Sequence, residues 1–184
     1  MLLIHGLGRS LEDWDEQHDL LSGQYRVISV DLPGCGVSRR LSVPTTRASR
    51  RGFVEDFLDG LEIDEQVRVA GNSVGGAVAM QFAVQARARV SSLLLVSSAG
   101  FGRDATMALP ILCLRPRAIG RFLLRPRRST AARAEFSLFC DDVFATPARV
   151  ERALRLAGRP GGAERSCAAA ESAGPAGRAG GNHR

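Results

Sequence analysis

A serine flanked by glycines lies at an abrupt change of hydrophobic pattern, and this feature constrains the fold most. Ser73 lies in the segment 71–76, Gly-Asn-Ser-Val-Gly-Gly, after the apolar run 67–70 and before the small, apolar stretch 77–83. The run predicts a strand and the stretch a helix, so the chain must turn sharply at the serine. Glycines on both sides allow that turn without Cβ collisions. The hydroxyl would then lie at a helix N-terminus, where partial positive charge collects, and Ser73 is therefore a candidate nucleophile.

Apolar runs alternate with helical patterns along the first hundred residues. Strands are predicted over residues 1–4, 25–31, 66–70 and 90–96, and helices over 11–21, 47–61 and 74–86. Uninterrupted apolar strands joined by helices require parallel pairing with both faces of the sheet covered. The predicted fold class is therefore α/β, with an open, mostly parallel sheet of about four strands flanked by helices.

The chain changes character after this predicted core, residues 1–100. Residues 101–157 are rich in arginine and apolar side chains without a strand-like run, and they are predicted to form a partial helical cap. A helix over 147–157 is well delimited, with Thr146 as its capping hydroxyl, Pro147 at its first position and Gly158 after its end. Residues 158–184 contain no Leu, Ile, Val or Phe and cannot offset their ordering entropy, so this tail is expected to be disordered.

Composition excludes several function classes. The chain has 184 residues, enough for one domain, and a formal charge of +6 with no lysine at all. Arginine in place of lysine, with abundant Ala and Gly, indicates a codon bias, and no recognition motif accompanies the charge, so no nucleic-acid partner is expected. The four cysteines are widely spaced, which predicts reduced thiols and no metal site or cofactor. Arginines interrupt the apolar stretch 107–124 and no secretory leader is evident, so no membrane span and a cytoplasmic location are expected.

Three segments together resemble the serine-nucleophile branch of the α/β-hydrolase family. They are 3–8 (Leu-Ile-His-Gly-Leu-Gly), 31–38 (Asp-Leu-Pro-Gly-Cys-Gly-Val-Ser) and 71–76, each at the C-terminal end of a predicted strand. One such segment alone is a weak signal, whereas three in the family's order are specific. The resemblance covers about residues 1–157. It implies that the strand ending at His5 lies between the strands ending at Asp31 and Ala70, where open α/β sheets bind ligands.

The resemblance also implies roles for individual residues. Ser73 Oγ would attack a carbonyl carbon, and the backbone N–H groups of Leu7 and Val74 would donate to the oxyanion that forms. The surrounding active-site loops would contain His5, Gly6, Gly8, Gly71, Asn72, Gly75 and Gly76. The turn after Asp31 is expected to be structural.

The implied substrate is a small apolar ester or carbonyl compound, because the predicted cap offers apolar side chains besides its arginines. These side chains are Leu109, Ile111, Leu112, Phe122, Leu123, Leu124, Phe136 and Phe139. The residues leave esterase, lipase, C–C bond hydrolase, peptidase and haloperoxidase activities open. Serine at position 73 disfavours the branch of the family that uses an aspartate nucleophile.

The catalytic acid and histidine of the family have no counterpart in this sequence. His5 is expected to orient the neighbouring loop, His18 lies among acids on a predicted solvated face, and His183 lies in the tail. In the family these two residues follow further strands after the cap, where this sequence turns to Ala, Gly and Arg. We therefore expect a reading frame truncated at its N-terminus and truncated or frame-shifted near Gly158.

Three other interpretations remain open. A Rossmann-type nucleotide-binding domain would also place 6–8, Gly-Leu-Gly, after one strand and Asp31 after the next, although Leu11 stands where its third glycine belongs. A catalytically inactive, hydrolase-derived fragment would act, if at all, through an exposed sheet edge at 90–96, by self-association. The glycine-rich turn could also be a plain connection that binds nothing.

Overall fold

The core of the chain is a parallel β-sheet. The structure is a computed structural model, and it describes residues 1–39, 47–100, 127–139 and 141–159. Its strands are β1 (Leu2–Ile4), β2 (Ile28–Val30), β3 (Val67–Asn72) and β4 (Val90–Val96), in the spatial order β2-β1-β3-β4 with every pair parallel. The α/β fold class and the central position of β1 are as the sequence predicts. The carboxyl ends of β1 and β3 therefore meet beside each other.

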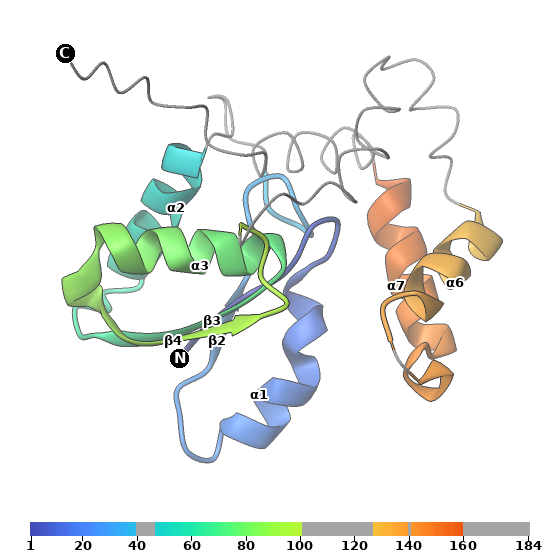
Figure 1. Cartoon of the computed structure of the whole chain (residues 1–184), viewed down its shortest axis with the longest axis horizontal. Helices are drawn as coiled ribbons and strands as arrows, with labels where there is room; N and C mark the ends of the chain where they lie inside the picture. The colour runs from blue at the N-terminus through green and yellow to red at the C-terminus, as the bar shows by residue number, and fades with distance from the viewer. Residues whose placement is uncertain (40–46, 101–126, 140, 160–184) are drawn as a thin grey trace, which may run out of the picture.

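Helices cover both faces of this sheet (Figure 1). The 3₁₀ turn η1 (Leu11–Trp14) leads into α1 (Asp15–Leu21), which lies on one face, whereas α2 (Arg47–Gly60) and α3 (Val74–Gln85) lie on the other. A short 3₁₀ turn, η2 (Arg87–Arg89), leads into β4. Further along the chain, α6 (Arg128–Phe136), η3 (Asp142–Phe144) and α7 (Pro147–Gly158) follow, and α6 packs against α7. We refer to these two helices as the α6–α7 pair.

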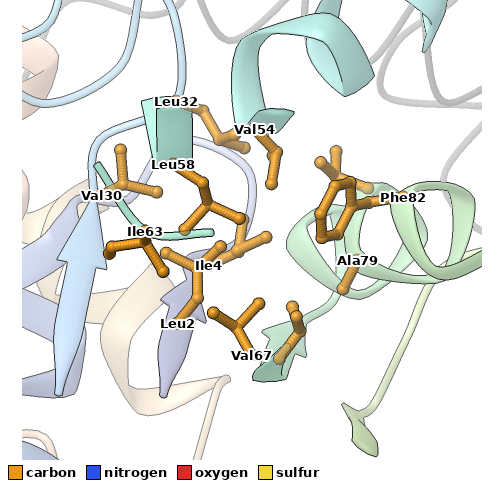
Figure 2. Packing of buried hydrophobic residues seen from close by; sticks show 12 residues of the cluster. Leu2, Ile4, Val30, Leu32, Val54, Leu58, Ile63, Val67, Ala79 and Phe82 are labelled. Carbon is orange, nitrogen blue, oxygen red and sulfur yellow. The ribbon is translucent and has the colours of Figure 1, made fainter. Parts of the chain in front are cut away.

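The main hydrophobic core lies between the sheet and helices α2 and α3 (Figure 2). Phe82 of α3 and Leu58 of α2 are fully buried against Leu2 and Ile4 of β1. Trp14 of η1 covers the opposite face in a smaller cluster with Leu3 and Ala70. Strand β1 is therefore buried on both faces, as the central strand of a covered parallel sheet is expected to be.

Several predicted boundaries differ from the observed ones. The predicted strand 25–31 pairs only over Ile28–Val30, because its partner β1 offers just three residues. Strand β3 extends past the predicted end to Asn72, since Asn72 still pairs with Val96 of β4. The predicted helix 11–21 begins with a 3₁₀ turn.

The last described helix begins as predicted. Thr146 Oγ1 accepts a hydrogen bond from the Arg149 backbone N–H, and Pro147 occupies the first turn of α7. The predicted tail lies outside the described residues, apart from its first two positions. Within the described ranges, no helix is both long and apolar enough to cross a bilayer.

Candidate active site

The segment 71–76, which we call the elbow, turns the chain from β3 into α3 at Ser73. The backbone of Ser73 adopts φ 50° and ψ −116°, a conformation that a residue with a side chain rarely occupies. Three hydrogen bonds hold it there: the Ser73 N–H donates to the Val96 carbonyl at 3.0 Å, and the Ser73 carbonyl accepts from Ala99 at 2.9 Å and from Ala77 at 3.2 Å. The Ser73 side chain is half-buried and does not cap α3. The fold thus maintains a strained serine whose hydroxyl is not used for helix capping.

Close backbone approaches explain the glycines of the elbow. A Cβ on Gly71 would lie 2.4 Å from the Gly75 carbonyl oxygen, and one on Gly75 would lie 2.3 Å from the backbone oxygens of Ile4 and His5. A Cβ on Gly76 would lie 2.5 Å from Ser98 Oγ. The backbone contacts at Gly71 and Gly75 leave no room for a Cβ, and the contact at Gly75 lets α3 start this close to the end of β1 only with glycine there.

The loop after β1 lies directly against the elbow. A Cβ on Gly6 would lie 2.9 Å from Asn72 Oδ1 and 3.4 Å from the Cβ of Ser73. The Arg9 N–H donates to the Gly6 carbonyl at 3.4 Å, which closes a turn with Leu7 and Gly8 at its centre, and Gly8 has φ 69°. We call residues 6–9 the β1 turn. The two loops that the sequence assigns to one site are therefore neighbours.

The amides proposed as oxyanion donors flank this contact. Val74 is the first residue of α3, where a helix leaves its N–H groups without intrahelical partners, and Leu7 is the second residue of the β1 turn. Within the described part of the chain, neither N–H donates a hydrogen bond. Both N–H groups therefore have no acceptor within the described ranges.

His5 is fixed in a structural role. Its Nδ1 lies 2.7 Å from the Gly6 carbonyl oxygen, and its Nε2 accepts a hydrogen bond from the Leu32 N–H at 3.1 Å. An acceptor Nε2 assigns the proton to Nδ1, so the ring is neutral and both its nitrogens are engaged. Burial lowers the pKa of His5, and this outweighs the opposing effects of the Gly6 hydrogen bond and the Asp31 carboxylate. The imidazole thus ties the loops after β1 and β2 together and has no nitrogen left for Ser73.

Asp31 also stabilises loop structure. Its carboxylate accepts backbone hydrogen bonds from Leu11 at 2.7 Å and from Val37 at 2.8 Å. The side chain of Ser38 donates to the Asp31 carbonyl at 2.8 Å. Asp31 lies 3.8 Å from His5 Nε2, which does not make an ion pair with a neutral ring. The turn after β2 is therefore structural, as expected.

The prediction that His18 lies on a solvated face among acids is wrong in its detail. His18 is half-buried, and its Nε2 lies 2.7 Å from Ser29 Oγ of β2. The neighbouring acids are not simply solvated either, because Asp15 and Glu16 form ion pairs with Arg152 and Arg149 of α7. Helix α1 is thus a contact surface for the α6–α7 pair.

Other predicted positions lie partly outside the described residues. The cap side chains 109–124, three of the four cysteines and His183 fall there, while Cys35 packs against the main core. Of the two remaining cap aromatics, Phe136 is exposed and Phe139 lies beside Phe144 and under the guanidinium of Arg149. In the described ranges, no cluster of three or more His, Cys, Asp or Glu side chains is arranged to hold a metal ion.

Two features of the site were not foreseen from the sequence. One is the turn after β4, 97–99, whose backbone clamps Ser73; its signal was the run of small residues directly after the strand. The other is the pairing of Arg9 with Asp13 and with Glu135 of α6. The first pair has the i, i+4 spacing of a helical ion pair, but nothing local in the sequence indicates the second.

Comparisons with known proteins identify the fold family. Residues 1–131 match the family model described as alpha/beta hydrolase fold. The chain is 46% identical over 102 residues to the dihydrolipoyllysine-residue acetyltransferase component of the acetoin cleaving system of Cupriavidus necator, covering 55% of this chain and 27% of that protein. It is 33% identical over 103 residues to the 2-hydroxy-6-oxo-6-(2'-aminophenyl)hexa-2,4-dienoic acid hydrolase of Metapseudomonas resinovorans, covering 54% and 36%.

Solved structures show the same fold. Cfl2 from Burkholderia cenocepacia superposes with a TM-score of 0.79 at 21% identity, covering 94% of this chain and 64% of that one. A meta-cleavage product hydrolase from Pseudomonas fluorescens gives a TM-score of 0.73 at 24% identity, covering 90% and 59%. The chain therefore spans about a quarter to two thirds of the length of these relatives. With its parallel sheet, its strained serine between β3 and α3 and a family match over residues 1–131, the chain belongs to the α/β-hydrolase fold family.

Proposed function

We propose that this chain carries the nucleophile and oxyanion portion of a serine hydrolase site. Ser73 Oγ is the nucleophile, and the N–H groups of Leu7 and Val74 are the donors to the oxyanion. The observation that carries this proposal is the backbone of Ser73, with φ 50° and ψ −116° at the junction of β3 and α3. Such strain persists only where the surroundings enforce it, and in this fold it presents the hydroxyl at the carboxyl edge of the sheet.

The proposed chemistry is acyl transfer to the serine. A bond forms between Ser73 Oγ and the acyl carbon, and the carbonyl oxygen takes up negative charge beside the two amides. A general base takes the serine proton and passes it to the leaving group as the carbonyl re-forms and the bond from carbon to that group breaks. Water then attacks the acyl carbon, its proton passes through the base to Ser73 Oγ, and the free acid leaves. Substrates of this class are small esters or compounds with a related acyl or C–C bond, in keeping with relatives named as a dienoic acid hydrolase and a lipase.

The described residues do not supply the base that this chemistry needs. Both ring nitrogens of His5 are engaged, and His18 of α1 is paired with Ser29 of β2. A serine without a general base retains its position and its oxyanion donors but loses most of its rate. We therefore expect Ser73 to react slowly with strong electrophiles and to turn over esters near background.

Covalent labelling tests this proposal. With an alkyl fluorophosphonate, a bond forms from Ser73 Oγ to phosphorus, fluoride leaves and the hydroxyl proton passes to solvent. Negative charge develops on the phosphoryl oxygen in the transition state, beside the proposed donors. Intact-mass and peptide mass spectrometry should find one adduct per chain, at Ser73. It should be absent from Ser73→Ala and kept in Ser98→Ala, which removes the neighbouring half-buried hydroxyl. Absence of an adduct at Ser73, or equal labelling of other serines, would contradict the assignment.

Ester turnover separates a complete site from an incomplete one. With an intact triad, hydrolysis of a p-nitrophenyl ester should fall about 10⁶-fold in Ser73→Ala. We expect instead that wild type and Ser73→Ala differ little. A large difference would mean that a base outside the described residues completes the site.

A second candidate function is association through β4 without catalysis. This strand is the last in the sheet among the described residues, and its apolar side chains Leu94 and Val96 are 55% and 39% exposed. An exposed, apolar edge strand is a template for pairing with another chain. A second copy of this chain is the partner that we propose for it.

A further inference from the structure

Arg9 links the β1 turn to helix α6. Its guanidinium forms two hydrogen bonds with the Asp13 carboxylate, at 2.7 and 2.8 Å, and a third with Oε1 of Glu135. Asp13 lies four residues along the chain, whereas Glu135 lies 126 residues away on α6. Arg9 therefore binds two carboxylates at once, one close to it in the sequence and one far from it.

The Arg9–Glu135 pair is enclosed. Glu135 is 1% exposed, and its second oxygen, Oε2, is buried without a hydrogen-bond partner among the described residues. Burial opposes the charged form of Arg9, but the hydrogen bonds and charges of Asp13 and Glu135 outweigh it and raise the pKa of Arg9 above its ordinary value. Arg9 thus stays charged, and the two carboxylates offset the cost of its desolvation.

The backbone of Arg9 belongs to the site. Its N–H donates to the Gly6 carbonyl and so closes the β1 turn, which places Leu7 at the first central position of that turn. Gly6 itself is in contact with Asn72 and Ser73 of the elbow. A displacement of Arg9 would therefore change the direction of the Leu7 N–H relative to Ser73.

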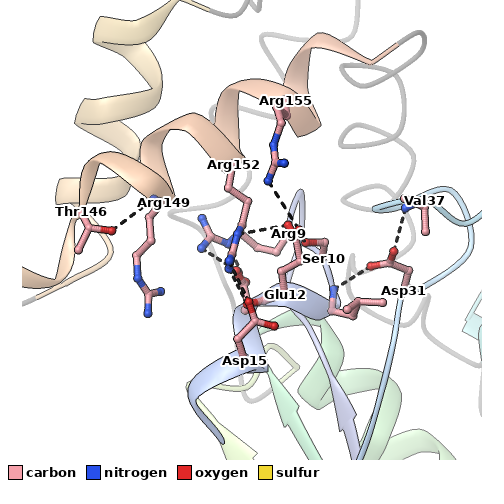
Figure 3. A network of polar contacts seen from close by, with 12 residues as sticks. Arg9, Ser10, Glu12, Asp15, Asp31, Val37, Thr146, Arg149, Arg152 and Arg155 are labelled. Carbon is pink, nitrogen blue, oxygen red and sulfur yellow. Dashed lines mark hydrogen bonds and ion pairs between the residues drawn. The ribbon is translucent and has the colours of Figure 1, made fainter. Parts of the chain in front are cut away.

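Helix α7 reinforces this connection on the same segment (Figure 3). Arginines 149, 152 and 155 recur every three residues along α7 and meet the acids of η1 and α1. Arg152 contacts Glu12 Oε2 at 3.2 Å and Asp15 Oδ2 at 2.9 Å, and Arg149 contacts Glu16 Oε1 at 2.6 Å. The α6–α7 pair is thus held to the segment that directly follows the β1 turn.

We propose that Arg9 is a positioning residue for the oxyanion site and that Glu135 sets its position. When α6 is docked, Glu135 fixes the Arg9 side chain, and the β1 turn then holds the Leu7 N–H toward Ser73. When α6 moves away, the turn loosens and the donor is lost. This inference rests on the proposed role of Leu7, and it adds that docking of the α6–α7 pair controls that role.

The test compares two carboxylate-to-amide variants in the full chain. Glu135→Gln removes the charge that faces Arg9, whereas Glu151→Gln removes an exposed charge on α7 that faces Arg128. Backbone ¹⁵N relaxation reports the mobility of the Leu7 and Gly8 amides. We expect their order parameters to fall from about 0.85 to below about 0.7 in Glu135→Gln, and to stay unchanged in Glu151→Gln. Arg9→Lys keeps the charge but loses the planar fork, and it should loosen the turn as Glu135→Gln does.

The rate of fluorophosphonate labelling at Ser73 is the second readout. Weakening of the Leu7 donor should slow labelling by about tenfold in Glu135→Gln, with no change in Glu151→Gln. A folded Glu135→Gln protein with unchanged relaxation at Leu7 and Gly8 would overturn the inference. If wild type is not labelled at Ser73, the proposed function fails, whereas the relaxation data still decide whether Glu135 controls the turn.

Discussion

At the scale of single residues, the strain at Ser73 has a measurable cost. A residue with a side chain is unfavourable at φ 50° and ψ −116°. The hydrogen bonds of the Ser73 N–H to the Val96 carbonyl and of the Ala99 N–H to the Ser73 carbonyl hold the backbone in this conformation. Ser73→Gly should relieve the strain, whereas Ser73→Ala keeps a Cβ and retains it. We expect the glycine variant to be more stable than the alanine variant by about 1 kcal/mol in urea denaturation. An alanine variant at least as stable as the glycine variant would mean that the backbone of Ser73 is not strained.

His5 makes stability depend on pH in a defined direction. Burial lowers its pKa in the folded chain, so in acid the unfolded chain takes up a proton at His5 before the folded chain does. The stabilisation is therefore complete above the ordinary histidine pKa of about 6.5 and decreases as the pH falls below it. We expect the urea midpoint of wild type to fall more between about pH 7.5 and pH 5.5 than that of His5→Gln. Equal losses in the two proteins would show that His5 is not held neutral in the folded chain.

At the scale of secondary structure elements, α7 is attached to the core by charge. Arg152 is 21% exposed and contacts two acids and the Glu12 carbonyl, whereas Arg128 is 70% exposed and, among the described residues, pairs with Glu151. Partly enclosed arginine networks contribute more than single surface pairs. Arg152→Ala should therefore cost about 1–2 kcal/mol and Arg128→Ala less than about 0.5 kcal/mol, measured by urea denaturation.

Salt provides the control for this prediction. The difference between wild type and Arg152→Ala should shrink as sodium chloride rises to about 1 M, because the Debye length falls to about 3 Å. A cost that does not change with salt would assign the effect of Arg152 to the packing of its aliphatic stem.

The elements also show where sequence patterns suffice. Strand β4 was predicted with its exact bounds and α3 to within one residue, because hydrophobic period and glycine placement are local signals. Strand β3 extends to Asn72 because Asn72 pairs with Val96 of β4. A local sequence pattern carries no information on such pairing between strands. The turn at Ser73 was predicted from the flanking apolar runs and the glycine spacing, and it lies between β3 and α3. The pairing of Arg9 with Glu135 joins residues far apart in the chain, so no spacing rule could have indicated it.

At the scale of the whole molecule, one face of the sheet is covered over β1 and β3 but left open over β4 within the described ranges. On the α1 side of the sheet, Leu3, Ala70 and Leu94 lie in register across β1, β3 and β4. Leu3 and Ala70 are 1% exposed, whereas Leu94 is 55% exposed, because the cover provided by Trp14 reaches β1 and β3 only. The continuous apolar sequence of β4 is typical of a strand covered on both faces, yet in the described residues one face is open.

The open face of the edge strand β4 predicts concentration-dependent self-association. Burial of one leucine side chain contributes about 1.5–3 kcal/mol, so Leu94→Lys should weaken association about tenfold or more. The matched control is Leu20→Lys, because Leu20 is 77% exposed and belongs to α1 and not to β4. Sedimentation velocity over a range of concentrations would measure the effect. A monomeric wild type at all concentrations, or equal weakening by the two lysines, would rule out β4 as the contact and leave acyl transfer at Ser73 as the function to pursue.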